Sequence, residues 1–297
     1  MEQVGFVGLG IMGRAMVSNL LKHGCTVLVN DISQAAVDAA VAGGAVAATL
    51  AEIASACKTI FLSLPSGTIS KQVLFGRDGL YGSLQKGALV ADTSSITPQE
   101  AMECAETLAL VGVSYLDCPV SGCEPGAVAG TLAFMVGGEE STFQAAMPYL
   151  EMMGSSALLT GPVGSGSVTK LANQIIVNLT IAAVSEAMVF ATKAGVCPER
   201  VYQAIRGGLA GSTVLEQKAP KMFNRDFAPG GKISINHKDI RNVLDAAHRL
   251  DVPVPFSAQL FEIMQSLKIA GYENEDHSGL VHYYERLADL EVKKGGV

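Results

Sequence analysis

Residues 4–13 read VGFVGLGIMG, a short apolar run that leads directly into glycines at positions 8, 10 and 13. Val4–Gly8 is predicted to be a strand, and helical spacing follows from Gly13 to His23. In such a unit the first glycine permits a tight turn, the second lets a pyrophosphate approach the backbone, and the third lets helix and strand pack closely. The stretch therefore predicts a dinucleotide-binding loop made of Gly8, Leu9, Gly10, Ile11, Met12 and Gly13.

The second predicted strand, Thr26–Asn30, runs into Asp31. An acidic residue at this distance from the glycines is expected to bind the ribose hydroxyls of the cofactor. A carboxylate there repels a 2′-phosphate, and the next residue is Ile32 and not an arginine that could hold one. Asn30 and Asp31 are therefore predicted cofactor residues, with NAD(H) preferred over NADP(H). The alternative is that Asp31 is only a turn residue after a strand.

Short apolar runs alternate with helical patterns as far as residue 161. Further strands are predicted at Thr59–Leu64, Ala88–Asp92, Ser114–Asp117 and Thr131–Val136, and helices at Ser33–Ala42, Leu50–Ser55 and Pro98–Gly112. Alternation of this kind requires crossover connections and a mainly parallel sheet. Residues 1–161 are therefore predicted to form a Rossmann-type α/β dinucleotide-binding domain.

The pattern changes near Gly161, where one long helical stretch without proline begins at Ser165 and ends at Ala194. The polar residues inside it favour a buried helix over a membrane span. The remaining helices are predicted at Pro198–Arg206, Ser212–Met222, His237–Leu250 and Ser257–Ala270. Residues 162–297 are therefore predicted to form an all-α substrate and oligomerisation domain, entered by a long interdomain helix.

Composition excludes several classes of function. The net charge of −7, with 16% charged residues and no dense basic cluster, argues against nucleic acid as a partner. No basic leader pattern precedes the first strand, so a cytoplasmic location is expected. None of the six cysteines forms a C-x-x-C pair and no H-E-x-x-H occurs, so reduced thiols and no metal site are predicted.

Two further segments carry candidate chemistry. Lys170 and Asn173 stand three residues apart in the long helix, so an ammonium and an amide share one face. The alternative is that the two residues only lie on a solvent-exposed face of the helix, which is the more common case for a lysine beside an asparagine. The segment Asp117–Gly122 is a second candidate, because backbone N–H groups and a hydroxyl in a loop can hold a carboxylate.

With these motifs the chain resembles the β-hydroxyacid dehydrogenase family over essentially its whole length. The matching stretches are Gly8–Gly13 with Met16, Asn19 and Leu20, Asp117–Gly122, Gly164–Gly166 with Lys170 and Asn173, and Lys238-Asp239. Within the family, residues 168–174 and 204–215 are most similar to the tartronate semialdehyde (2-hydroxy-3-oxopropionate) reductases. The resemblance implies NAD(P)H-dependent reduction of tartronate semialdehyde to D-glycerate by a homodimer or homotetramer.

The resemblance also implies roles for single residues. Lys170 would be the catalytic proton donor, Ser121, Gly122 and Asn173 would bind a small carboxylate-bearing substrate, and Leu64, Pro65, Ser95 and Lys238 would contact the cofactor. Lys238 has an alternative role as the partner of a nearby carboxylate. One position departs from the family: Cys123 stands where a second loop glycine is usual, and a positive φ there would strain the backbone.

Other functions remain open at this point. The substrate could be another small acid, such as 3-hydroxyisobutyrate, L-threonate, glyoxylate or succinic semialdehyde. The chain could instead be a sensor that binds NADH without turnover, or a structural partner in a larger assembly that uses its long helix for contact. Lys170 argues against the sensor, because binding alone does not require it.

Overall fold

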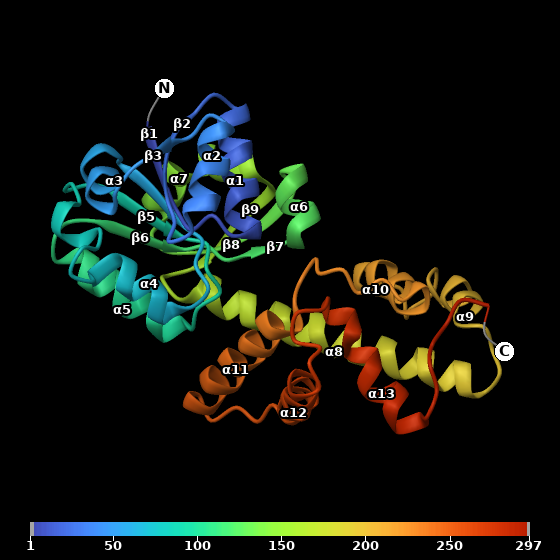
Figure 1. Cartoon of the computed structure of the whole chain (residues 1–297). Helices are drawn as coiled ribbons and strands as arrows, with labels where there is room; N and C mark the ends of the chain where they lie inside the picture. The colour runs from blue at the N-terminus through green and yellow to red at the C-terminus, as the bar shows by residue number, and fades with distance from the viewer. Residues whose placement is uncertain (1–2, 296–297) are drawn as a thin grey trace. The chain divides into compact units, whose positions relative to one another are not determined.

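The computed structural model describes residues 3–295; residues 1–2 and 296–297, which the predicted domains include, lie outside the described residues. The chain divides into two compact units, Met1–Lys170 and Leu171–Val297 (Figure 1). This division falls inside helix α8 (Ser165–Lys193), whereas the sequence predicts a domain boundary at residues 161–162.

The first unit is built on one sheet. Within residues 3–295 its nine strands are β1 (Gln3–Val7), β2 (Thr26–Asn30), β3 (Val46–Ala47), β4 (Thr59–Leu62), β5 (Leu89–Asp92), β6 (Ser114–Asp117), β7 (Val120–Ser121), β8 (Leu132–Gly137) and β9 (Gly154–Gly161). Their order is β3-β2-β1-β4-β5-β6-β8-β7, with β9 paired to β8. Only the pairings of β8 with β6 and β7 are antiparallel. The predicted Rossmann-type fold with a mainly parallel sheet is confirmed.

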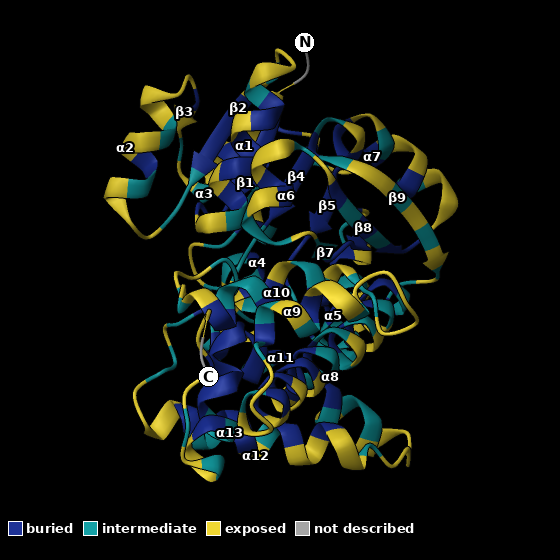
Figure 2. Ribbon diagram, turned by 90° about the vertical axis from the view of Figure 1, so that its right-hand side faces the viewer, coloured by how far each residue is buried: buried dark blue, intermediate teal, exposed yellow. Residues whose placement is uncertain are grey.

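Helices cover both faces of this sheet. They are α1 (Ile11–Lys22), α2 (Gln34–Ala42), α3 (Leu50–Ala56), α4 (Gly67–Phe75), α5 (Pro98–Ala109), α6 (Cys123–Ala129) and α7 (Glu140–Met153). Because side chains alternate along a strand, Phe61 packs in the core with α1 and α7, while Ile60 and Leu62 pack with α3, α4 and α5. The central strands are accordingly buried on both faces (Figure 2).

Several elements of this unit were not predicted from the sequence: α4, α6, α7, β3, β7 and β9. In α7 the buried residues Phe143, Ala146 and Leu150 keep helical spacing, but Pro148 interrupts the pattern. A proline inside a helix removes one backbone hydrogen bond, so it usually argues against a helix. Tertiary packing against the sheet stabilises α7 despite this.

The second unit is helical, as predicted. With the later part of α8 it contains α9 (Pro198–Ile205), α10 (Thr213–Asn224), α11 (Ile233–Arg249), α12 (Pro255–Ile269) and α13 (Val281–Ala288). Among the described residues, α8 is the one helix long and apolar enough to cross a membrane, and 44% of its most apolar window is buried. Ile181 and Met188 of α8 are fully buried in the core of this unit, and the core helix of a folded domain passes the same test.

Candidate active site

Five parallel strands of the first unit end in one row of register partners, formed by Asn30, Val7, Leu62, Asp92 and Asp117. The segments that follow parallel strands leave the sheet at one edge, which is where ligands bind in folds of this type. The predicted cofactor residues of this unit lie at or after these strand ends: Gly8–Gly13, Asn30-Asp31, Leu64-Pro65 and Ser95.

The glycine loop has the shape that a dinucleotide needs. Gly8 has a φ of 98°, and a Cβ there would collide with the carbonyl of Ser63. A Cβ on Gly13 would collide with the carbonyl of Gly8, whereas one on Gly10 would meet nothing within 4 Å. Gly10 therefore faces open space at the N-terminus of α1, where backbone N–H groups can approach a pyrophosphate.

Asp31 lies against this loop. Its Oδ2 accepts a hydrogen bond from the backbone N–H of Leu9 at 2.6 Å, and its Oδ1 accepts one from Ser33 at 2.8 Å. Each carboxylate oxygen can accept a further hydrogen bond, so Asp31 can still bind ribose hydroxyls. The side chain of Asn30 instead donates to the carbonyl of Ala48 at 2.7 Å, which leaves its backbone as the part beside the loop.

The substrate loop predicted from the sequence lies between β6 and α6. Gly122, at its end, has a φ of 135°, and the next residue, Cys123, has a φ of 54°. This is the left-handed backbone that favours glycine. The strain expected if Cys123 required a positive φ is therefore present.

Asp117 connects this loop to the start of α8. Its Oδ1 accepts from the backbone N–H of Gly164 at 2.8 Å, and its Oδ2 accepts from that of Ser167 at 2.6 Å. Burial raises the pKa of Asp117 to about 6, and these two hydrogen bonds oppose the rise. This role of Asp117 was not predicted from the sequence, although a carboxylate at a strand end is a common partner for the unpaired N–H groups of a helix start.

Lys170 reaches the same loop from the second turn of α8. Its Nζ donates to the carbonyl of Val120 at 2.9 Å, and the residue is only 9% exposed. The structure therefore brings Lys170 to the loop that holds Ser121 and Gly122. A lysine ammonium beside a carboxylate-binding loop can stabilise and protonate an oxyanion.

Asn173 and Lys238 belong to the helical unit. Asn173 donates from Nδ2 to Oε1 of Gln174 at 3.0 Å, and Lys238 forms an ion pair with Asp239 in which Nζ and Oδ1 are 3.1 Å apart. The alternative role of Lys238, as the partner of a neighbouring carboxylate, thus has a structural basis. Gln174, which is not among the predicted site residues, belongs to the first pair and also donates to Asp239, so it connects the two pairs.

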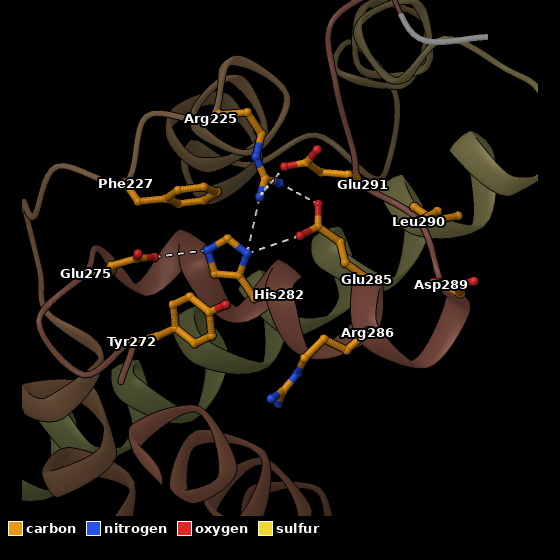
Figure 3. A pocket seen from close by; sticks show the side chains of 10 residues that line it. All are labelled: Arg225, Phe227, Tyr272, Glu275, His282, Glu285, Arg286, Asp289, Leu290 and Glu291. Carbon is orange, nitrogen blue, oxygen red and sulfur yellow. Dashed lines mark hydrogen bonds and ion pairs between the residues drawn. The ribbon is translucent and has the colours of Figure 1, made fainter. Parts of the chain in front are cut away.

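A pocket of about 670 Å³ opens elsewhere in the helical unit (Figure 3). At its centre, Nδ1 of His282 lies 3.1 Å from Glu285 and Nε2 lies 3.0 Å from Glu275, while Arg225 pairs with Glu285 and Glu291. Because none of the predicted site residues lines this pocket, it is not the candidate active site.

Two family models match successive parts of the chain. The family model for the NAD binding domain of 6-phosphogluconate dehydrogenase matches residues 3–161, and that for the NAD-binding region of NADP-dependent 3-hydroxyisobutyrate dehydrogenase matches residues 164–284.

The similarity extends over whole chains. 2-Hydroxy-3-oxopropionate reductase of Escherichia coli (strain K12) is 40% identical over 97% of this chain and 98% of its own. 2-(Hydroxymethyl)glutarate dehydrogenase of Eubacterium barkeri is 35% identical over 99% and 98%. The crystal structure of 3-hydroxyisobutyrate dehydrogenase from Salmonella typhimurium superposes with a TM-score of 0.86 at 29% identity, covering 95% of this chain and 99% of that one. The chain belongs to the β-hydroxyacid dehydrogenase family of NAD(P)-binding oxidoreductases.

Proposed function

We propose that this protein reduces tartronate semialdehyde to D-glycerate. The observation that carries the reaction is the 2.9 Å hydrogen bond from Lys170 to Val120, which holds an ammonium at the predicted substrate loop. The choice of substrate rests on the 40% identity to the E. coli 2-hydroxy-3-oxopropionate reductase and on residues 168–174 and 204–215.

When bound, the reduced nicotinamide supplies the hydride. The hydroxyl of Ser121 and the backbone N–H of Gly122 hold the substrate carboxylate, so that the aldehyde lies near Lys170. Negative charge grows on the aldehyde oxygen during reduction, and Lys170 stabilises this charge and donates the proton. Asn173 holds a further polar group of the substrate, and Lys238 contributes to cofactor binding.

The proposed cofactor preference is NAD(H). The carboxylate of Asp31 lies within hydrogen-bond distance of the Leu9 backbone, so a 2′-phosphate near the ribose would face a negative charge. Gly8–Gly13, Leu64, Pro65 and Ser95 form the rest of the proposed cofactor site in the first unit.

We also propose a homodimer or homotetramer in which α8 contributes to subunit contact. Ile176 and Phe190 of this helix are 67% and 75% exposed within the single chain. Exposed large apolar side chains on a long helix favour a protein partner over water. Light scattering of the purified protein measures the subunit number, and a monomer would refute this part of the proposal.

The test of the function mixes protein, NADH and tartronate semialdehyde and follows the loss of NADH absorbance. NADPH, 3-hydroxyisobutyrate with NAD⁺, L-threonate with NAD⁺, glyoxylate and succinic semialdehyde form the panel. The highest kcat/KM with NADH and tartronate semialdehyde supports the proposal. A higher kcat/KM with another acid would support the proposed type of reaction but show that the substrate is a different acid. NADH binding without any turnover would support the alternative that the protein is an NADH sensor.

A further inference from the structure

A buried polar cluster in the helical unit joins Asn173 to the Lys238–Asp239 pair. Gln174 of α8 is only 6% exposed, and Asp239 of α11 is 3% exposed. The Nε2 of Gln174 donates to Oδ2 of Asp239 at 2.5 Å, and its Oε1 accepts from Nδ2 of Asn173 at 3.0 Å. The second oxygen of Asp239 forms the ion pair with Lys238.

These contacts fix the direction of every hydrogen bond in the cluster. A carboxylate that is paired with an ammonium accepts hydrogen bonds and donates none. Asp239 therefore requires the –NH₂ group of Gln174 to face it, and the carbonyl oxygen of Gln174 must then face Asn173. Asn236, also on α11, supports the same orientation, because its Oδ1 lies 3.3 Å from Nε2 of Gln174.

The orientation of Asn173 follows from that of Gln174. Since the –NH₂ group of Asn173 faces Gln174 and donates to it, the carbonyl oxygen of Asn173 lies on the other side of the amide, where it can accept a hydrogen bond from a ligand. An amide turned the other way would present a donor. Asn173 is half-buried, so a ligand group that reaches it loses water and must form the matching hydrogen bond.

We propose that Gln174 and Asp239 are positioning residues that hold Asn173 with its oxygen toward the substrate, so that the enzyme selects acids with a hydrogen-bond donor, a hydroxyl, at that position. This inference rests on the proposed function, in which Asn173 contacts substrate. Tartronate semialdehyde carries such a hydroxyl on carbon 2, whereas 3-oxopropanoate is the same acid without it. A site built to form a hydrogen bond with a hydroxyl discriminates strongly against the analogue without it, because a polar group of the site is then left unpaired.

The first experiment compares these two substrates in the wild-type enzyme and in Gln174→Met, which keeps the side-chain length and removes the hydrogen bonds of Gln174 to Asn173, Asp239 and Asn236. We expect kcat/KM for tartronate semialdehyde to fall about tenfold, mainly through KM, and kcat/KM for 3-oxopropanoate to change less than about twofold. Gln144→Met is the matched control, because Gln144 also binds a carboxylate, Glu140, but is exposed on α7. Equal losses for both substrates, or no loss, would overturn the proposal.

A single variant and a compensating double variant distinguish a lost hydrogen bond from misfolding. Gln174→Glu sets two carboxylates against each other and should lower kcat/KM for tartronate semialdehyde more than Gln174→Met does. Adding Asp239→Asn restores a donor between positions 174 and 239 and still lets Asn173 donate to position 174. The double variant should therefore recover most of the lost kcat/KM, and failure to recover in a protein with a wild-type melting temperature contradicts the inference.

Nuclear magnetic resonance separates this inference from the proposed function, because it requires no turnover. The Nδ2 protons of Asn173 should exchange with water more slowly in the wild type than in Gln174→Met. Equal exchange rates would refute the fixed amide. Slow exchange in a wild-type enzyme that reduces neither aldehyde would refute the proposed substrate and leave the orientation of Asn173 established.

Discussion

Replacing Cys123 by glycine tests whether the substrate loop stores backbone strain. The left-handed conformation at a φ of 54° costs a non-glycine residue about 1–2 kcal/mol, which glycine avoids. Glycine also makes the unfolded chain more flexible, which offsets roughly 0.5–1 kcal/mol of that gain. The free energy of unfolding should therefore rise by about 1 kcal/mol.

This change is large enough to measure as a melting temperature. The entropy of unfolding is roughly 2.1 cal/mol/K per residue, or about 0.36 kcal/mol/K for the 170 residues of the unit Met1–Lys170. A gain of about 1 kcal/mol then raises the melting temperature of that unit by roughly 3 °C.

Calorimetry on the wild type, Cys123→Gly and Cys123→Ala provides the assay. Alanine removes the thiol but keeps the Cβ, so Cys123→Ala should gain no stability from relief of strain. The difference between the two variants isolates the backbone contribution. If Cys123→Gly melts at or below the temperature of Cys123→Ala, the loop is not strained and the reasoning is wrong.

Three further predictions follow from the site. Lys170→Met should lower kcat by about 10²–10⁴-fold with unchanged NADH affinity by fluorescence titration, whereas Lys193→Met, which removes another α8 lysine bonded to a carbonyl at 2.9 Å, should keep normal turnover. Asp31→Ser should raise the NADPH/NADH ratio of kcat/KM by about tenfold or more, because it removes the repulsion of a 2′-phosphate, and an unchanged ratio would refute that role. Because the folded-state pKa of Asp117 is raised from 3.8 to about 6, its contribution to stability is present below pH 3.8 and is lost as the pH rises through 6. Urea denaturation should show wild-type stability falling relative to Asp117→Asn, by up to about 3 kcal/mol between pH 4 and pH 7, and parallel pH curves would contradict this.

Local patterns predicted the elements whose own residues determine their shape. The glycines that follow β1 and the apolar strands predicted the Rossmann fold, because their spacing can be read along the chain itself. For Gly13 the steric reason is local as well, since a Cβ there would collide with the carbonyl of Gly8. The long apolar pattern of α8 likewise predicted the start of the helical unit. By contrast, β7 has two residues and pairs only with β8, so no local pattern marks it.

The sequence predicted candidate site residues but not the contacts that hold them. Lys170 was singled out from the sequence, yet its partner is the backbone carbonyl of Val120, 50 residues earlier, and a carbonyl carries no sequence signal. The contacts of Asp117 and Gln174 are equally hard to predict from the sequence. Apart from Asn173, which adjoins Gln174, their partners named above are 47 to 65 residues away, so their roles depend on tertiary contacts that spacing along the chain does not reveal.

The division of the chain within α8 bears on how such enzymes diversify. Lys170 is the last residue of the first unit, and Asn173, one helical turn later, belongs to the second. A recombination event at this point between the genes of two relatives would transmit the proposed proton donor with the first unit and the proposed substrate-binding amide with the helical unit. The retained half would keep its reduction chemistry while the acquired half brought a different selectivity, and a library of such chimaeras would explore new substrates without rebuilding the reaction.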